Sequence, residues 1–174
     1  MSELFSIQLQ NRQQSRDGVW LDLPTTTEQV QAALRQIGIS SDNPQGLFIS
    51  GYFAEEEKRF AISYNMVLAS NVDELNFLAS RLETLSTGER AELNAALQAP
   101  QSELFSIGRI TDFPENVDYY VHLPDVTGTG QLGDYYLNRS GMVDMPEEWK
   151  AGIFLPRFGL HIANTCLLYT SPSP

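Results

Sequence analysis

The sequence predicts an α+β fold divided into three small domains, and three observations lead to this prediction. Apolar and polar residues alternate in short segments near the N-terminus, as in strands with one buried face. In the middle of the chain, apolar residues recur at helical spacing after residues that can cap a helix. The C-terminal part contains both strand-like and helix-like patterns. A chain of 174 residues, 42% of them hydrophobic, has enough material for one ordinary domain or for two to three very small ones.

The first domain, residues 2–63, is predicted to be a small sheet with one helix. Alternation predicts strands over residues 2–10 and 18–23, and a third strand is expected over residues 47–53. After a charged turn, residues 60–64 form a candidate fourth strand.

A helix is expected between the second and third strands. Thr27 has a side chain that can cap a helix N-terminus. The apolar residues behind it follow the i, i+3, i+4, i+7 stripe of an amphipathic helix: Val30, Ala33, Leu34 and Ile37. Gly38 follows this stripe and is predicted to end the helix in a left-handed conformation.

The middle domain, residues 64–103, is predicted to be a pair of short helices. Asn71 stands three residues before Glu74, and Ser86 stands three residues before Glu89, which is the spacing of capping boxes. Each pair precedes an apolar stripe, so each is expected to open one helix of a hairpin.

The third domain, residues 104–165, is predicted to mix strand and helix. Residues 104–110 have strand character, and a helix is expected over residues 131–138, with Gly141 ending it. A second short helix is expected to open at Pro146, because proline suits the first turn of a helix and acids stand beside it.

Acidic residues are the most prominent feature of the composition. The chain has 22 acids against 11 bases, a formal net charge of -11 at pH 7. We therefore expect it to repel nucleic acid and anionic membranes and to be attracted to basic surfaces. Between Ile110 and Glu148 the only base is Arg139, and eight carboxylates accompany it: Asp112, Glu115, Asp118, Asp125, Asp134, Asp144, Glu147 and Glu148.

Several classes of protein are disfavoured. The sequence predicts no membrane span and no secretory leader, because it has no run of about 18 apolar residues and no basic leader before an apolar stretch. A cytoplasmic location is therefore expected. The single cysteine, Cys166, argues against disulfides and thiolate zinc sites, and His122 and His161 lack ligand spacing. We expect no cofactor and no metal.

One motif is similar to a phosphate-binding loop. Residues 128–133 have the G-x-G-x-x-G spacing that brings backbone amides to a pyrophosphate. The residues before this motif do not form a buried strand, and Asp125 and Asp134 flank it with the wrong charge for a phosphate. The favoured interpretation is a flexible turn that leads into a helix.

Acid and base catalysis by two carboxylates leaves no strict sequence signature, so it has to be weighed. Glu147 and Glu148 are adjacent, which on a helix turns them about 100° apart, and residues 55–57 are three glutamates in a polar turn. Neither set looks shielded. A carboxylate-pair hydrolase and a generic acidic module that binds a basic protein stay open as alternatives, and solubility alone also explains scattered acids.

A series of motifs resembles the ArdA family of antirestriction proteins, both in order and in spacing. The resemblance rests on the series rather than on any single motif, and it covers most of residues 3–164. The segments that carry it are Gly18 to Pro24, Asn71 to Leu85, Asn116 to Tyr120, Leu123 to Val126, Leu132 to Tyr136, and Pro146 with Glu147.

This resemblance implies a DNA mimic that is not an enzyme. It implies an elongated, curved and usually dimeric protein whose carboxylates imitate the phosphates of bent duplex DNA and occupy the DNA groove of type I restriction-modification enzymes. Such a groove has to neutralise phosphates that carry one charge per about 1.7 Å of duplex axis. Rigidly held carboxylates can make the same charge-assisted contacts.

The resemblance also suggests which residues act. Four acids lie in matching motifs and are the first candidates for phosphate mimicry: Asp118, Asp125, Asp134 and Glu147. Charge alone adds Asp112, Glu115, Asp144, Glu148, Glu55, Glu56 and Glu57. One segment matches the part that the family associates with activity and dimer contact, which makes Leu132, Gly133, Tyr135, Tyr136 and Leu137 candidates for a homodimer interface or its supporting core. Packing inside the third domain explains Tyr135 and Leu137 equally well.

The chain departs from the family in two respects. Many relatives look more acidic, so a net charge of -11 leaves fewer phosphate equivalents. The resemblance fades after Thr165, and residues 166–174 look like an unrelated tail in place of an expected glycine-containing strand.

Overall fold

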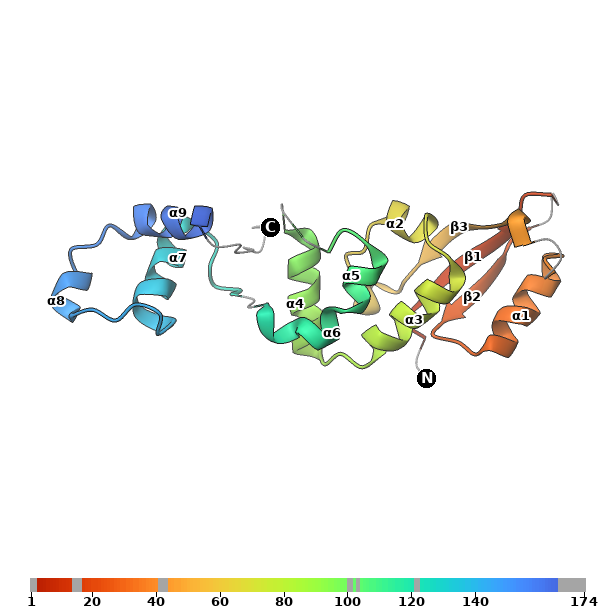
Figure 1. Ribbon diagram of the computed structural model, residues 1–174, viewed down its shortest axis with the longest axis horizontal. Helices are drawn as coiled ribbons and strands as arrows, with labels where there is room; N and C mark the ends of the chain where they lie inside the picture. Colours follow the sequence, from red (N-terminus) through yellow and green to blue (C-terminus); the bar gives the residue numbers. More distant parts are fainter. Residues whose placement is uncertain are drawn as a thin grey trace.

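The computed structural model describes residues 3–13, 17–40, 44–99, 102, 104–120 and 123–165. It confirms the α+β class: a three-stranded antiparallel sheet is combined with many short helices (Figure 1). The molecule is elongated, with the sheet toward one end of its long axis. Three helices lie toward the other end: α7 (Thr129–Asp134), α8 (Glu147–Lys150) and α9 (Leu155–Thr165).

The sheet has the order β2-β1-β3, in which β1 (Phe5–Asn11) pairs antiparallel with β2 (Val19–Leu23) and β3 (Leu47–Phe53). All three predicted strands are confirmed. The apolar side chains of one face are buried, among them those of Ile7 and Leu9. This face of the sheet therefore packs into the hydrophobic core.

The predicted fourth strand over residues 60–64 is wrong, although its alternation is real. Phe60 and Ile62 are buried, but the extended backbone leads into helix α2 (Tyr64–Leu68). The side chain of Asn94 replaces a neighbouring strand: its Oδ1 accepts from the Ala61 N–H at 2.7 Å, and its Nδ2 donates to the Arg59 carbonyl at 3.4 Å.

Helix α1 (Thr27–Gln36) has its N-cap one residue earlier than predicted. The side chain of Thr26, not that of Thr27, accepts from the Gln29 N–H. In return, the Gln29 side-chain oxygen accepts from the Thr26 N–H. A capping box needs this spacing of three residues, which only Thr26 offers to Gln29. Gly38 ends the helix region with φ 73°, as predicted. A short 3-10 turn, η1 (Pro44–Gly46), then leads into β3.

Both helices predicted for the middle segment are present, but they do not pack side by side as the predicted hairpin. Asn71 caps α3 (Val72–Glu83) by accepting from the Glu74 N–H at 2.8 Å. Ser86 and Glu89 form a reciprocal capping box at α4 (Thr87–Gln98). Both helices turn an apolar stripe inward, and four leucines are fully buried: Leu75, Leu78, Leu82 and Leu93.

The strand expected over residues 104–110 is wrong, because this segment leads into helix α5 (Ile107–Thr111). Ser106 caps the helix by accepting from the Arg109 N–H. The buried residues Ile107, Ile110 and Thr111 are spaced i, i+3, i+4, which is a helical stripe. Two short elements follow, α6 (Phe113–Asn116) and the 3-10 turn η3 (Val117–Tyr119).

One core cluster includes buried residues from Leu4 to Phe113, so the sheet shares it with α1, α3, α4 and α5. Val126, Leu132 and Leu137 are buried outside this cluster. The division into domains 2–63, 64–103 and 104–165 concerns independent folding and stays a prediction.

In the C-terminal part, the helix expected over residues 131–138 is present but begins at Thr129, and its second half is a π-helical segment, η4 (Tyr135–Arg139). Gly141 follows with φ 70°. Pro146 is the N-cap of α8, near the start that the sequence predicted. Helix α9 was not predicted. None of the helices in the described part of the chain has the length and hydrophobicity that a bilayer crossing requires.

Candidate acidic interaction surface

The described carboxylates all lie at the protein surface. The buried polar side chains among the described residues are Asn11 and Thr111, and no described Asp or Glu is buried. Ten of the eleven candidate acids are exposed, and Asp134 is half-buried. A carboxylate pair shielded from water, which acid–base catalysis would use, is therefore not found in the described part of the chain.

The first group of acids follows the sheet. Glu55 is the N-cap of the 3-10 turn η2 (Glu56–Lys58), and its carboxylate lies 2.9 Å from the Lys58 Nζ. This hydrogen bond raises the pKa of Lys58, and the nearby charges of Glu3 and Glu57 act in the same direction. Local negative charge therefore exceeds what one lysine neutralises.

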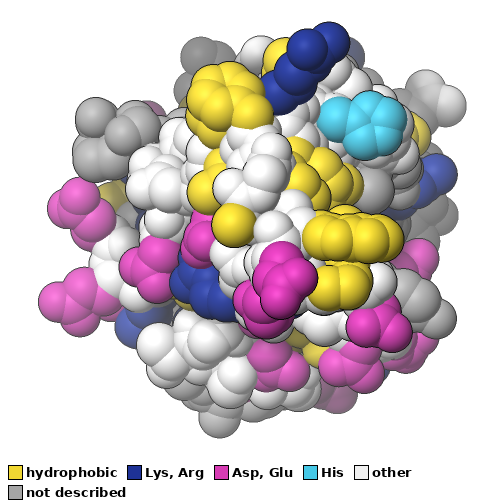
Figure 2. Space-filling view, turned by 90° about the vertical axis from the view of Figure 1, so that its left-hand side faces the viewer, with side chains coloured by type: hydrophobic (Ala, Val, Ile, Leu, Met, Phe, Trp, Pro, Cys, Tyr) yellow, Lys and Arg dark blue, Asp and Glu magenta, His cyan; other side chains and the backbone are white. Residues whose placement is uncertain are grey.

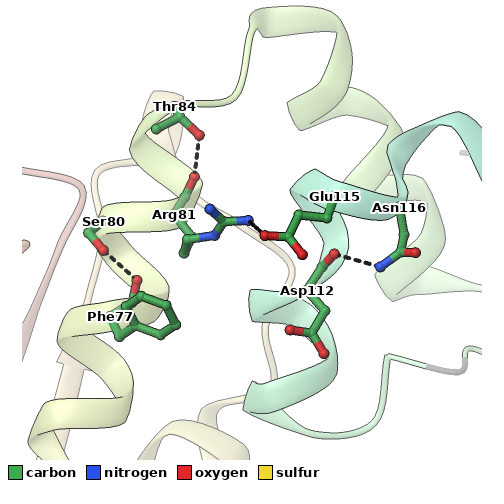
Figure 3. A network of polar contacts seen from close by, with 7 residues as sticks. All are labelled: Phe77, Ser80, Arg81, Thr84, Asp112, Glu115 and Asn116. Carbon is green, nitrogen blue, oxygen red and sulfur yellow. Dashed lines mark hydrogen bonds and ion pairs between the residues drawn. The ribbon is translucent and has the colours of Figure 1, made fainter.

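The second group lies where α5, α6 and η3 meet (Figure 3). The carboxylate of Glu115 lies 2.7 Å from the Arg81 guanidinium of α3, so this ion pair connects α6 to α3. The Asn116 side chain donates to the Asp112 backbone carbonyl at 2.9 Å, which leaves the Asp112 carboxylate outside this network. Asp118 lies in η3 and is exposed.

The third group belongs to the C-terminal part. Asp134 accepts from the Asn138 amide at 2.8 Å and lies 3.6 Å from Arg139, while Glu147 lies 2.7 Å from Lys150. Three further acids of this part are exposed: Asp125, Asp144 and Glu148. Glu147 and Glu148 stand in the first turn of α8, where the helix dipole favours negative charge.

The candidate acids therefore fall into two classes. Four have a base within ion-pair distance: Glu55, Glu115, Asp134 and Glu147. Within the described part of the chain the other seven have none: Glu56, Glu57, Asp112, Asp118, Asp125, Asp144 and Glu148. The second class presents negative charge that no base in the described part of the chain compensates at short range.

The residues predicted for the dimer motif lie mostly inside the chain. Leu132, Gly133 and Leu137 are buried, whereas Tyr135 and Tyr136 are half-buried, with their rings edge to face at 5.8 Å. The helices α7 and α9 pack closely where Gly133 meets Gly159. This segment supplies core contacts within the chain, and its role in a dimer stays a prediction.

Other sequence motifs have structural roles. Gly128 is the N-cap of α7, and Gly133, the last glycine of the same motif, packs against α9. Among the described residues no group of three or more His, Cys, Asp or Glu side chains could hold a metal ion. His161 is exposed on α9, while His122 and Cys166 lie outside the described residues.

Sequence reasoning did not single out the exposed large apolar side chains. These are Trp20, Phe53, Tyr64, Phe77, Phe105, Met142, Trp149, Phe154 and Leu160. For Trp20 the signal was present, because strand alternation turns it away from Leu21 and Leu23.

Comparison with known proteins identifies the family. The model of the family described as Antirestriction protein (ArdA) matches residues 14–163, which is most of the chain. A search of the curated proteins finds no match. ArdA antirestriction proteins are inhibitors and not enzymes, in agreement with the resemblance seen in the sequence motifs. The chain belongs to the ArdA family of antirestriction proteins.

Proposed function

We propose that this protein inhibits type I restriction-modification enzymes by mimicking duplex DNA and occupying their DNA-binding groove. Membership of the ArdA family implies an antirestriction function and the inhibition of restriction enzymes. The observation that supports the mimicry is the set of seven exposed carboxylates without an ion pair in the described part of the chain. Because restriction enzymes meet DNA inside the cell, the proposal also places the protein in the cytoplasm.

Electrostatics explains why such a surface competes with DNA. A DNA groove is lined by Lys and Arg, which pair with phosphate oxygens irrespective of base sequence. Carboxylate oxygens accept the same charge-assisted hydrogen bonds. The molecule is elongated, and its candidate acids belong to segments before α2, around α6 and around α8, so they extend over much of the chain (Figure 1).

We also propose that the protein acts as a homodimer through its C-terminal part. Figure 2 looks along the long axis at this end and shows apolar side chains gathered on the surface among acidic ones. The exposed apolar residues of this part are Met142, Trp149, Phe154 and Leu160, with exposed fractions of 50% to 74%. Apolar patches of this kind mark contact sites, and pairing through them would lengthen the acidic surface.

The test is a cleavage assay of unmodified DNA by a type I enzyme, titrated with the protein at two salt concentrations, with a type II enzyme as control. We expect inhibition of the type I enzyme that weakens steeply as salt rises, because exposed charges are screened. Excess competing duplex should relieve the inhibition.

Binding that ignored both salt and competing duplex would contradict groove occupation. If a folded sample, verified by circular dichroism, bound another basic protein but left the type I enzyme active, the generic acidic module would be the better explanation. Sedimentation of the same sample tests the dimer, and a monomer at assay concentration would contradict that part of the proposal.

A further inference from the structure

We propose that the solvent-facing side of the sheet is a second contact surface, which binds arginine side chains of the restriction enzyme by stacking on Trp20 beside Asp22. This inference rests on the proposed function, but it concerns Trp20 and Asp22, which are neither among the candidate phosphate mimics nor among the candidate dimer residues. The experiments distinguish a failure of the proposed antirestriction function from a failure of the arginine-binding surface.

The register of the sheet brings these residues together. On β1, the side chains that alternate with the core residues face solvent, and Ser6 is opposite both Asp22 and Phe53. Gln8 is opposite Trp20 on one side and Gly51 on the other. Trp20 is 50% exposed and Phe53 is 58% exposed, so two aromatic side chains stand on an incompletely covered face.

Gly51 gives the indole its position. A Cβ added to this glycine would lie 3.0 Å from the Trp20 Cη2 and 3.1 Å from the Gln8 Cβ. The indole therefore reaches from β2 across the central strand to β3. It forms a broad aromatic surface over the sheet instead of projecting freely into water.

The charge around this surface favours a cationic partner. Asp22 accepts from the Ser6 hydroxyl at 2.6 Å and remains exposed. Because Ser6 also pairs with Phe53, the glutamates that follow β3 lie toward the same end of the sheet. Glu3 is there too, since it lies close enough to Lys58 to influence that side chain electrostatically. This end of the sheet has two bases, Lys58 and Arg59, and five carboxylates outnumber them. The carboxylates are Glu3, Asp22, Glu55, Glu56 and Glu57.

The same face already holds one guanidinium on an aromatic ring. Phe48 is opposite Gln10 in the register, and the Arg12 guanidinium carbon lies 5.4 Å from the centre of the Phe48 ring. Trp20 is a better platform for this contact than Phe, and Asp22 lies two residues along the strand on the same face, about 7 Å away. An arginine can therefore stack on the indole and pair with the carboxylate. A nucleic acid is disfavoured here by the surrounding acids.

The test uses Trp20→Leu and Asp22→Asn in the full chain, with Phe77→Leu as the matched control. Phe77 is 60% exposed on α3, outside the sheet. We expect Trp20→Leu and Asp22→Asn each to weaken inhibition of the type I enzyme on the order of tenfold, and Phe77→Leu to leave it unchanged. Asparagine can still accept from Ser6, so Asp22→Asn keeps the fold even if Trp20→Leu proves unstable.

A second measurement is independent of the enzyme. In a Trp149→Phe background Trp20 is the remaining tryptophan, and its fluorescence should change on titration with hexa-arginine more than with hexalysine. If the wild type fails to inhibit but hexa-arginine binds, the proposed function fails and the arginine surface stands. Unchanged inhibition by both sheet variants overturns the inference. So does a response to single-stranded oligonucleotide instead of arginine. A dimer seen by sedimentation in the wild type but lost in both sheet variants would also overturn it, because the face would then bind a second copy.

Discussion

At the scale of single residues, Gly159 and Gly133 set the closest approach between two helices. A Cβ at Gly159 would collide with the Thr129 carbonyl oxygen, and a Cβ at Gly133 would collide with that of Leu155. Sequence motifs singled out Gly133, but they did not predict its close packing against α9, because that helix was not predicted. Capping residues such as Ser86 were predictable, since a capping side chain and the N–H group from which it accepts are three residues apart.

The close approach yields a prediction for stability. Gly159→Ala should destabilise the packing of α7 against α9 by about 1–3 kcal/mol, because the collision is with backbone, which cannot rotate away as a side chain can. Hydrogen exchange of the α7 and α9 amides measures the loss.

Gly130→Ala is the matched control. Gly130 is also in α7, but its added Cβ would come no closer than 3.7 Å, to the Pro156 ring, which is ordinary contact. It should be neutral or slightly stabilising, because alanine favours helix over glycine. Equal protection of α7 and α9 in both variants would show that the helices separate easily and that the glycine contact is unimportant.

At the scale of elements, local signals predicted well and signals that depend on distant partners did not. The strands β1, β2 and β3 and the helices α3 and α4 follow from alternation, stripes and caps contained in their own residues. Residues 60–64 alternate like a strand, but Asn94 supplies their backbone partner from far along the chain. Helix α9 contains Gly159 in its interior, which lowers helix propensity, and it is held by packing on α7.

The cap of α4 yields a prediction on pH. Hydrogen bonds from the Ser86 hydroxyl and backbone N–H lower the pKa of Glu89 below its ordinary value of 4.5. A carboxylate with a lowered pKa in the folded state stabilises the fold above the pKa of the unfolded chain, and this contribution disappears as pH falls through the folded pKa. The free energy of unfolding should therefore decrease below about pH 4.5 in the wild type.

Glu89→Gln isolates this contribution, because glutamine accepts the same bonds without titrating. Its unfolding free energy should depend less on pH between 7 and 3 than that of the wild type. Ser86→Ala removes the cap itself and should cost about 1 kcal/mol at pH 7. Chemical denaturation at several pH values measures both, and parallel pH curves for wild type and Glu89→Gln would exclude Glu89 as a contributor.

At the scale of the whole molecule, the sequence predicted an acidic surface but none of the ion pairs that compensate part of its charge. The pair of Glu147 with Lys150 has the i, i+3 spacing of helical ion pairs, so the sequence could have indicated it. Asp134 and Arg139 are five residues apart, which is outside that spacing. The pair of Glu115 with Arg81 joins segments 34 residues apart and emerges only from the packing of α5 and α6 near α3. The net charge thus follows from composition alone, whereas the fold decides which carboxylates lack a nearby base.

This distinction gives two matched variants, each lacking four negative charges. One neutralises acids that have a base partner: Glu55→Gln, Glu115→Gln, Asp134→Asn and Glu147→Gln. The other neutralises acids without one in the described part of the chain: Asp112→Asn, Asp118→Asn, Asp125→Asn and Asp144→Asn. The formal change in net charge is the same in both.

If the protein mimics phosphates, the second variant should lose more affinity for a type I enzyme, because its acids are available to pair with the Lys and Arg of the groove without breaking a bond. At about 0.3–1 kcal/mol for each exposed charge pair, four such losses amount to about 10- to 1000-fold in affinity at low salt. The first variant instead frees four bases, so its affinity should fall through repulsion that salt screens. Titrations of both variants in the cleavage assay at two salt concentrations, with thermal unfolding to verify the folds, measure the difference. Equal losses in both variants would mean that the enzyme responds to total charge, and that no particular carboxylate stands in for a phosphate.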